Sequence, residues 1–137
     1  MATPFQDVYD AFLGKVTDFD LAVLTDEELK ERLLPRMKTA ISKFKQCRKS
    51  LDIDEFLEEF LVSLEDDEIE ILGTLMLVEW YAPQINNILN TKQFLSDKDY
   101  RFYSQANHLG AMTRARKEAK KEANEMIVDY TFRHELV

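Results

Sequence analysis

The apolar positions near the start of the chain recur at intervals of three and four residues, the spacing of one helical face. They are Phe5, Val8, Tyr9, Phe12, Leu13 and Val16. Thr3 precedes them as a capping hydroxyl, Pro4 suits the first helical position, and Gln6 completes a capping box. We therefore expect an amphipathic helix that is capped by Thr3 and reaches Val16.

A second capping box, formed by Thr25 and Glu28, predicts another helix start. Its apolar face runs as far as Pro35, which lacks an amide and clashes with the preceding turn, so the helix should kink or restart there. Beyond the proline the same pattern continues through Met37, Ala40, Ile41, Phe44 and Cys47.

The middle of the chain combines an ambiguous stretch with a strongly apolar one. Residues 50–63 first alternate like a strand and then adopt helical spacing, and we favour a helix or an irregular loop. The acidic first turn at residues 65–68 precedes a segment that is apolar nearly all round, as in a helix at the centre of a domain or beneath a partner. Pro83 should end or kink this helix, and the asparagines within residues 86–91 indicate a loop.

Helix-favouring residues continue from an N-cap signal at Ser96 to about Phe132, with only Gly110 as an interruption. Such a helix would be about 50 Å long, whereas a compact domain of this size is roughly 35–40 Å across. The helix should therefore break at Gly110 or project beyond the domain. Alanines recur at every fourth position of this helix, at Ala111, Ala115, Ala119 and Ala123. They reflect either helix propensity or a seam of small residues that a partner helix can approach closely. Larger residues would extend this seam at Met126, Ile127 and Tyr130.

The composition favours an all-α fold. The 137 residues include only 3 Gly and 3 Pro, too few for the turns of a sandwich or barrel. We expect one small helical domain with a long C-terminal helix, in which residues 1–95 form the core and residues 96–137 the long helix and tail. The single cysteine, Cys47, should be a buried structural thiol. Neither a leader peptide nor a spanning segment is apparent, which predicts synthesis in the cytoplasm and no membrane contact.

Charge is segregated along the chain, whose formal net charge is -8. Residues 50–91 contain eleven acidic residues and no lysine or arginine, so the remainder is slightly basic. This acidic segment is a solvated face that keeps the protein soluble, a surface for a basic partner, or a wall that repels nucleic acid. The residues that we assign to it are Asp52, Asp54, Glu55, Glu58, Glu59, Glu65, Asp66, Asp67 and Glu68.

A basic cluster lies on the predicted long helix and consists of Arg114, Arg116, Lys117, Lys120 and Lys121. If it contacts phosphates, neutralising these residues should weaken a salt-dependent binding to DNA. Neighbouring glutamates dilute the cluster and no aromatic residues are interleaved with it. This pattern favours docking onto an acidic protein surface, including the acidic segment of another copy.

The sequence gives little support to catalysis or metal binding. Neither His108 nor His134 has a second ligand at a suitable spacing, and one cysteine cannot complete a zinc site. Asp52 and Asp54 begin like a calcium loop, but Phe56 replaces the next ligand and the turn glycine is missing. We therefore expect a protein without catalytic residues, metal or cofactor, and we interpret His108 as a packing residue.

Two stretches, residues 94–100 (FLSDKDY) and 103–109 (YSQANHL), resemble small structural proteins encoded among the head and neck genes of tailed bacteriophages that infect Gram-positive bacteria. The resemblance extends to parts of residues 4–10 and 68–86, and so covers most of the chain, while residues 131–137 lie outside it.

This resemblance implies a head–tail connector or adaptor, an α-helical subunit that joins the portal ring, commonly as a twelve-fold ring, and continues the DNA channel toward the tail. It implies the portal protein and other neck or tail proteins as partners, and passage of DNA without sequence-specific binding. It also implies a location in the neck of the virion, after assembly in the host cytoplasm. The alternative is a small helical regulatory or adaptor protein that binds a single protein partner.

Overall fold

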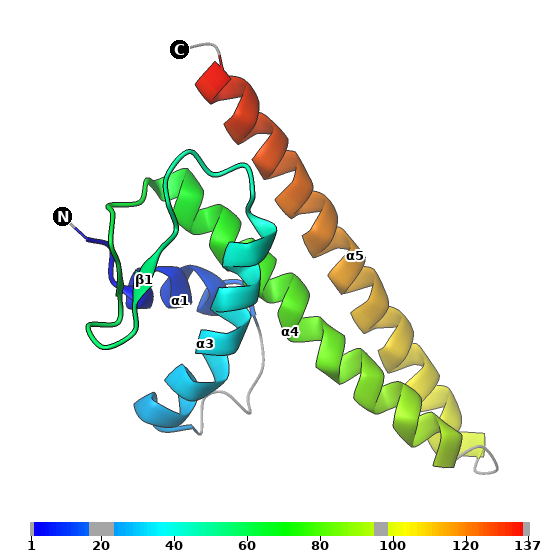
Figure 1. The fold of residues 1–137 in the computed structure, drawn as a ribbon. Helices are drawn as coiled ribbons and strands as arrows, with labels where there is room; N and C mark the ends of the chain where they lie inside the picture. The colour runs from blue at the N-terminus through cyan, green and yellow to red at the C-terminus, as the bar shows by residue number, and fades with distance from the viewer. Residues whose placement is uncertain (1, 17–23, 95–98, 136–137) are drawn as a thin grey trace.

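The computed structural model describes residues 2–16, 24–94 and 99–135. The elements in chain order are α1 (Phe5–Leu13), α3 (Asp26–Lys43), β1 (Ile53–Asp54), β2 (Glu59–Phe60), α4 (Asp66–Phe94) and α5 (Asp99–Glu135). Figure 1 shows α4 and α5 as a long antiparallel helical hairpin, with α1, α3 and the β-hairpin gathered beside α4. The predicted all-α class with a long C-terminal helix is confirmed.

Helix α4 forms the centre of the core because it is covered on almost every side. Residues 71–78 are buried throughout, and α1, α3 and α5 all contact this helix. The ring of Phe12, in α1, meets the Trp80 ring edge-on at 5.7 Å, and the Arg36 guanidinium, in α3, lies 4.6 Å from the centre of the Trp80 ring. The prediction of a central helix that is apolar nearly all round is confirmed.

The start of the chain differs from its prediction. Helix α1 ends at Leu13 rather than Val16, and Pro4 occupies the capping position without a side-chain hydrogen bond. The Thr3 hydroxyl does not cap the helix, because it accepts a hydrogen bond from the Leu64 amide at 2.7 Å instead. This bond ties the N-terminal residues to the segment that precedes α4.

The two interior prolines end neither helix. Helix α3 begins after the predicted Thr25 cap, whose hydroxyl accepts from the Glu28 amide at 3.2 Å, and it continues through Pro35. Helix α4 continues through Pro83, so the loop predicted within residues 86–91 is wrong. Packing against neighbouring helices offsets the cost of about 3 kcal/mol that an interior proline imposes.

Residues 50–63 contain a short antiparallel hairpin rather than the helix or loop that we favoured. Its pairs are Ile53 with Phe60 and Asp54 with Glu59. Thr3 adds to the hairpin, because its carbonyl accepts from the Phe60 amide at 2.7 Å. The buried Phe60 ring lies 5.6 Å from the Phe5 ring, so the hairpin is fixed to the core.

Helix α5 passes through Gly110 without a break, so projection is the outcome observed for this long helix. The projecting part is not its C-terminal half, because Ala119, Ala123, Ile127 and Tyr130 all belong to the core. Instead, the end of α4 and the start of α5 extend beyond α1 and α3 (Figure 1). The predicted N-cap Ser96 lies outside the described residues. Among the described helices, none is long and apolar enough to cross a membrane.

Helices α1 and α4 approach closely at Gly73, which leads to a testable prediction. A Cβ on Gly73 would lie 3.0 Å from Ala11 Cβ and 3.1 Å from the amide nitrogen of Phe12. Because the backbone of α1 cannot retreat as a flexible side chain can, we expect Gly73→Ala to lower the free energy of unfolding by about 1–2 kcal/mol, even though alanine favours helix. Chemical denaturation measures the change.

Gly110→Ala is the matched control for this prediction. Only the flexible end of the Arg114 side chain lies near its Cβ position, at 3.3 Å. Alanine should therefore stabilise α5 there by up to about 1 kcal/mol. A Gly73→Ala protein as stable as the Gly110→Ala protein would contradict the close contact between α1 and α4.

Candidate functional site

The alanine seam of α5 is covered over half of its length by α4 of the same chain. Ala119 is 4% and Ala123 0% exposed, whereas Ala115 is half-buried and Ala111 exposed. The larger residues predicted to extend the seam also pack against or within the core: Met126, Ile127 and Tyr130. Of the two interpretations left open by the sequence, the inner half of the seam fits a helix contact, but that contact is with α4 of the same chain. Only Ala111 and Ala115 remain open to another molecule.

The basic cluster lies on the side of α5 that faces solvent. Lysines 117, 120 and 121 are exposed, as is Arg114, while the half-buried Arg116 donates from Nε to the Val78 carbonyl at 3.3 Å. Two exposed apolar residues continue the same face, Val128 at 65% and Phe132 at 63% exposure. We call Lys117, Lys120, Lys121, Val128 and Phe132 the outer face of α5.

The acidic segment is divided between two places in the fold. The β-hairpin and its approach hold Asp52, Asp54, Glu55, Glu58 and Glu59, and the start of α4 holds Glu65, Asp66, Asp67 and Glu68. Glu68 does not belong to a surface, because its side chain is only 1% exposed. Its assignment to an acidic surface is therefore wrong.

A groove with acidic walls lies between α1, α3 and the turn of the β-hairpin. Its volume is about 390 Å³, and glutamates line it from both sides: Glu27 and Glu31 from α3, Glu55 and Glu58 from the turn. We call this the acidic groove. Lys30 of α3, also in its lining, pairs with Glu58 at 3.3 Å and so joins the two walls. Glu27 and Glu31 were missed by the sequence analysis, although their spacing of one helical turn is visible there.

The floor of the acidic groove is apolar and aromatic, with Phe5 and Tyr9 from α1. Burial and, to a smaller extent, the nearby Glu58 carboxylate together raise the pKa of Tyr9 to about 12. The Tyr9 hydroxyl therefore stays protonated at neutral pH and is not a base. The groove offers an apolar floor and negative walls, which suits a cationic side chain with an aliphatic stem.

The turn between β1 and β2 holds two apolar side chains in solvent. Phe56 is 93% and Leu57 59% exposed. The Asp54 carboxylate accepts from both of their amides, at 3.0 and 3.1 Å, and Glu58 adopts the left-handed conformation with φ 54°. For a residue other than glycine, that conformation raises the free energy of the folded state by about 1–2 kcal/mol. The exposed pair is thus held in place by a strained, hydrogen-bonded turn, which the sequence analysis missed.

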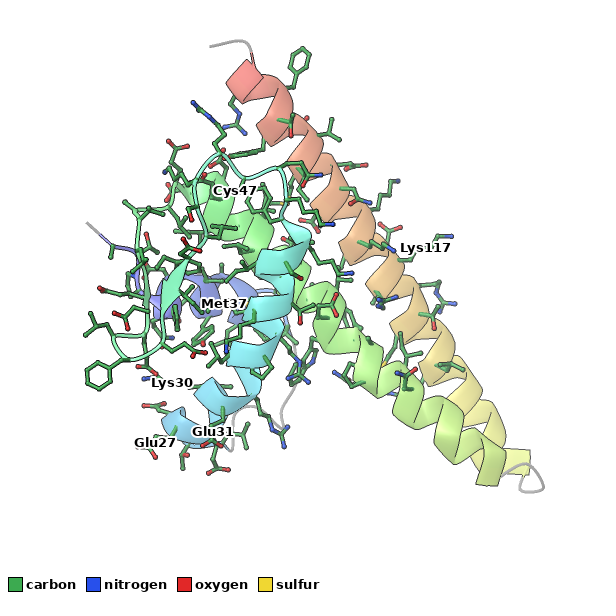
Figure 2. All side chains as sticks on the ribbon, viewed as in Figure 1. Glu27, Lys30, Glu31, Met37, Cys47 and Lys117 are labelled. Carbon is green, nitrogen blue, oxygen red and sulfur yellow. The ribbon has the colours of Figure 1, made fainter. Side chains whose placement is uncertain are left out.

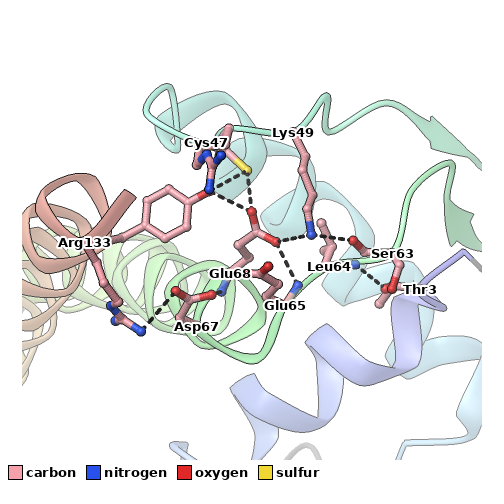
Figure 3. Close-up of polar contacts among 11 residues, drawn as sticks. Thr3, Cys47, Lys49, Ser63, Leu64, Glu65, Asp67, Glu68 and Arg133 are labelled. Carbon is pink, nitrogen blue, oxygen red and sulfur yellow. Dashed lines mark hydrogen bonds and ion pairs between the residues drawn. The ribbon is translucent and has the colours of Figure 1, made fainter. Parts of the chain in front are cut away.

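Glu68 is the centre of a buried polar network that joins three segments of the chain (Figure 3). Its carboxylate accepts from the Tyr130 hydroxyl of α5 at 2.7 Å and from the Glu65 amide at 2.8 Å. It also pairs with Lys49 Nζ at 3.1 Å and accepts from Cys47 Sγ at 3.5 Å. The network fixes the C-terminal half of α5 to the loop after α3.

The protonation states in this network suit a structural role. Burial raises the pKa of Glu68, but hydrogen bonds from Glu65, Tyr130 and Lys49 together outweigh it, so the pKa lies below the usual value. Burial raises the pKa of the Cys47 thiol and of the Tyr130 hydroxyl, which favours their neutral forms. Cys47, half-buried here, is therefore no activated nucleophile.

Three carboxylates at the start of α4 have ligand atoms within 4.8 Å of one another: Glu65, Asp67 and Glu68. Cationic side chains already neutralise two of them, since Lys49 pairs with Glu68 and Arg133 lies 3.6 Å from Asp67. We therefore assign these carboxylates to the buried network rather than to a metal ion. Of the two histidines, His108 is exposed, so its interpretation as a packing residue is wrong, and the His134 side chain lies outside the described residues.

Comparison of the chain with protein-family models, with curated protein sequences and with solved structures gives no match. A functional assignment therefore depends on the surfaces described above.

Proposed function

We propose that this protein is a head–tail connector subunit of a tailed bacteriophage, which docks on the portal ring and extends the DNA channel toward the tail. The observation that carries the proposal is the α4–α5 hairpin, whose far end extends beyond the core. The alanine seam is open on that part of α5, at Ala111 and Ala115. A protruding helical pair with small exposed residues can insert between the helices of a larger assembly.

The placement of negative charge also supports this proposal. Exposed carboxylates gather before and at the start of α4, where Asp52, Glu65 and Asp66 reach solvent. A ring of such subunits would repeat these carboxylates around its axis. Phosphates would be repelled from a wall of this kind, so DNA could pass without adhering to it.

The buried network around Glu68 is consistent with a structural subunit that binds its neighbours and catalyses no reaction. Glu68 is bound by several donors, and Lys49, its ion-pair partner, also donates to the Ser63 carbonyl at 2.8 Å. Groups held in this way position segments of the chain and are poorly placed to exchange protons with a substrate.

Light scattering coupled to size-exclusion chromatography tests the proposal. We expect the protein to elute with the portal protein of its phage as a complex of high mass. The Ala111→Glu, Ala115→Glu double variant should lose this complex, because two carboxylates would enter the open seam. Thr113→Glu is the matched control, since Thr113 is exposed on the opposite side of the same helix and should leave the complex intact.

Two other outcomes would contradict parts of the proposal. A protein that remains unchanged in mass on mixing with the portal would overturn the connector assignment and favour the regulator of a single partner. A double variant that binds the portal as the original protein does, with unchanged helix content by circular dichroism, would show that the open seam is not the docking site.

A further inference from the structure

Large exposed apolar side chains of the described residues gather in two places. Phe56, Leu57 and Leu61 belong to the β-hairpin, and Val128 and Phe132 belong to the outer face of α5. Single exposed apolar residues are ordinary, whereas groups of them beside charged residues are typical of interfaces. Covering either group would remove apolar area from water, so each group marks a candidate interface.

Charges of opposite sign accompany the two groups. Phe56 and Leu57 lie beside the acidic groove, where Glu55 and Glu58 already pair with Lys38 and Lys30. Glu27 and Glu31 supply the remaining negative charge of the groove. On α5 the three lysines of the outer face precede Val128 by two to three turns of the same exposed side, and they outnumber the two acidic residues there, Glu125 and Asp129. Covering one surface with the other would bury apolar area and also pair carboxylates with ammonium groups.

The two surfaces cannot meet within one molecule. Figure 2 shows Glu27, Lys30 and Glu31 at one side of the protein and Lys117 at the opposite side, with α4 between them. A contact between them must therefore join two copies. Because the two faces differ, such a contact is heterologous, and it repeats from copy to copy until a ring closes.

The spacing of the charged residues agrees on the two faces. Glu27 and Glu31 are one helical turn apart on α3, and Lys117 and Lys121 are one turn apart on α5. Residues at this spacing have Cβ atoms about 5–6 Å apart, so two helices lying side by side can form both ion pairs at once. The shapes also agree, since α5 is a convex helix and the acidic groove is concave.

We propose that the outer face of α5 in one copy docks into the acidic groove of the next copy. Lys117 and Lys121 pair with Glu31 and Glu27, and Val128 contacts the exposed Phe56 and Leu57. This inference builds on the proposed function, because a ring subunit must meet its two neighbours through different faces. It assigns the basic cluster to protein contact rather than to phosphate binding.

A zero-length carbodiimide cross-linker tests this contact in the full chain. The reagent joins lysine and carboxylate side chains only where they are in direct contact. An equal mixture of nitrogen-15-labelled and unlabelled protein, cross-linked at high concentration and again on the portal, identifies links between copies by mass spectrometry. We expect mixed-label links from Lys117 or Lys121 to Glu27 or Glu31.

Charge reversal supplies the second arm of the test. Lys117→Glu with Lys121→Glu should reduce the yield of cross-linked dimer at least about tenfold, since two attractive pairs become repulsive. Adding Glu27→Lys and Glu31→Lys to the same chain should restore the yield. Lys45→Glu with Arg48→Glu is the matched control, because these exposed residues lie outside both faces and their reversal changes the net charge equally.

The outcomes separate this inference from the connector assignment. Absence of mixed-label links between these faces, both in the concentrated protein and on the portal, would overturn the inference even if the portal complex forms. Links in the concentrated protein without any portal binding would support the inference and overturn the connector assignment. If reversal of the lysines abolishes binding to DNA and leaves the dimer yield unchanged, the outer face is a phosphate-binding surface and the inference is wrong.

Discussion

Replacement of Phe12 by alanine is expected to lower the free energy of unfolding by about 3–5 kcal/mol. Phe12 is 0% exposed and its ring lies 5.7 Å from that of Trp80, where α1 crosses the central helix. The backbones of α1 and α4 already touch at Gly73, so they cannot move closer to fill the cavity. Domains of this size are stable by only about 5–15 kcal/mol, so much of the stability would be lost.

Urea denaturation followed by circular dichroism measures this loss. Phe132→Ala is the control, because it removes the same ring from a position that is 63% exposed. We expect that control to change stability by no more than about 0.5 kcal/mol. Similar losses in the two variants would contradict the position of α1 in the core.

Replacement of Glu68 by alanine should cost about 2–3 kcal/mol at neutral pH. The change removes the acceptor of the Tyr130 hydroxyl and the carboxylate that pairs with Lys49, both in a site where Glu68 is 1% exposed. The loss of stability is smaller than for a buried charge left without any partner, because the Lys49 ammonium keeps its hydrogen bond to the Ser63 carbonyl. Glu70→Ala is the control, since Glu70 is 48% exposed in its ion pair with Lys15 and should contribute at most about 1 kcal/mol.

The stabilising effect of Glu68 should depend on pH in a defined direction. Its pKa is lower in the folded protein than in the unfolded chain, so the folded state favours the ionised carboxylate. This contribution is complete above the usual glutamate pKa of about 4.3 and is lost as the pH falls through the lower folded value. The stability difference between the original protein and Glu68→Ala should therefore shrink on acidification. A difference that is constant from about pH 7 to pH 3 would contradict the network.

Local signals in the sequence predicted two helix starts correctly. Thr25 and Glu28 form the cap that was expected, and the acidic residues before the central helix mark its first turn. The continuous apolar character of α4 predicted a place at the centre of the domain or beneath a partner, and the helix lies at the centre. These features depend on residues within one or two turns of each other, which is why periodicity and capping rules are sufficient for them.

At the two interior prolines, a kink or an end of the helix was predicted, and neither helix ends there. Pro35 and Pro83 break a helix in isolation, but α3 and α4 gain more from packing than the prolines cost. Thr3 fails as a cap for a similar reason, because its hydroxyl has a partner 61 residues away in the Leu64 amide. Competition from distant partners cannot be read from neighbouring residues.

The candidate surfaces were predicted only in part. Four of the five residues of the basic cluster are exposed, whereas Arg116 is half-buried. The acidic groove combines Glu27 and Glu31 with the turn of the hairpin, and this combination exists only in the folded chain. Glu68 was counted among surface charges because Tyr130, its buried partner, lies 62 residues further along. The turn that exposes Phe56 carries no glycine, although Glu58 adopts a left-handed conformation.

The covering of α4 by α5 has a consequence for the order in which the protein folds. Tyr130 donates to Glu68 and accepts from the Arg48 amide, 82 residues earlier, so these bonds form only after most of the chain has left the ribosome. Until then α4 lacks one of its covering helices and presents apolar side chains to solvent. Nascent chains that stall within α5 should therefore aggregate or recruit chaperones, whereas chains that stall after Tyr130 should close their core.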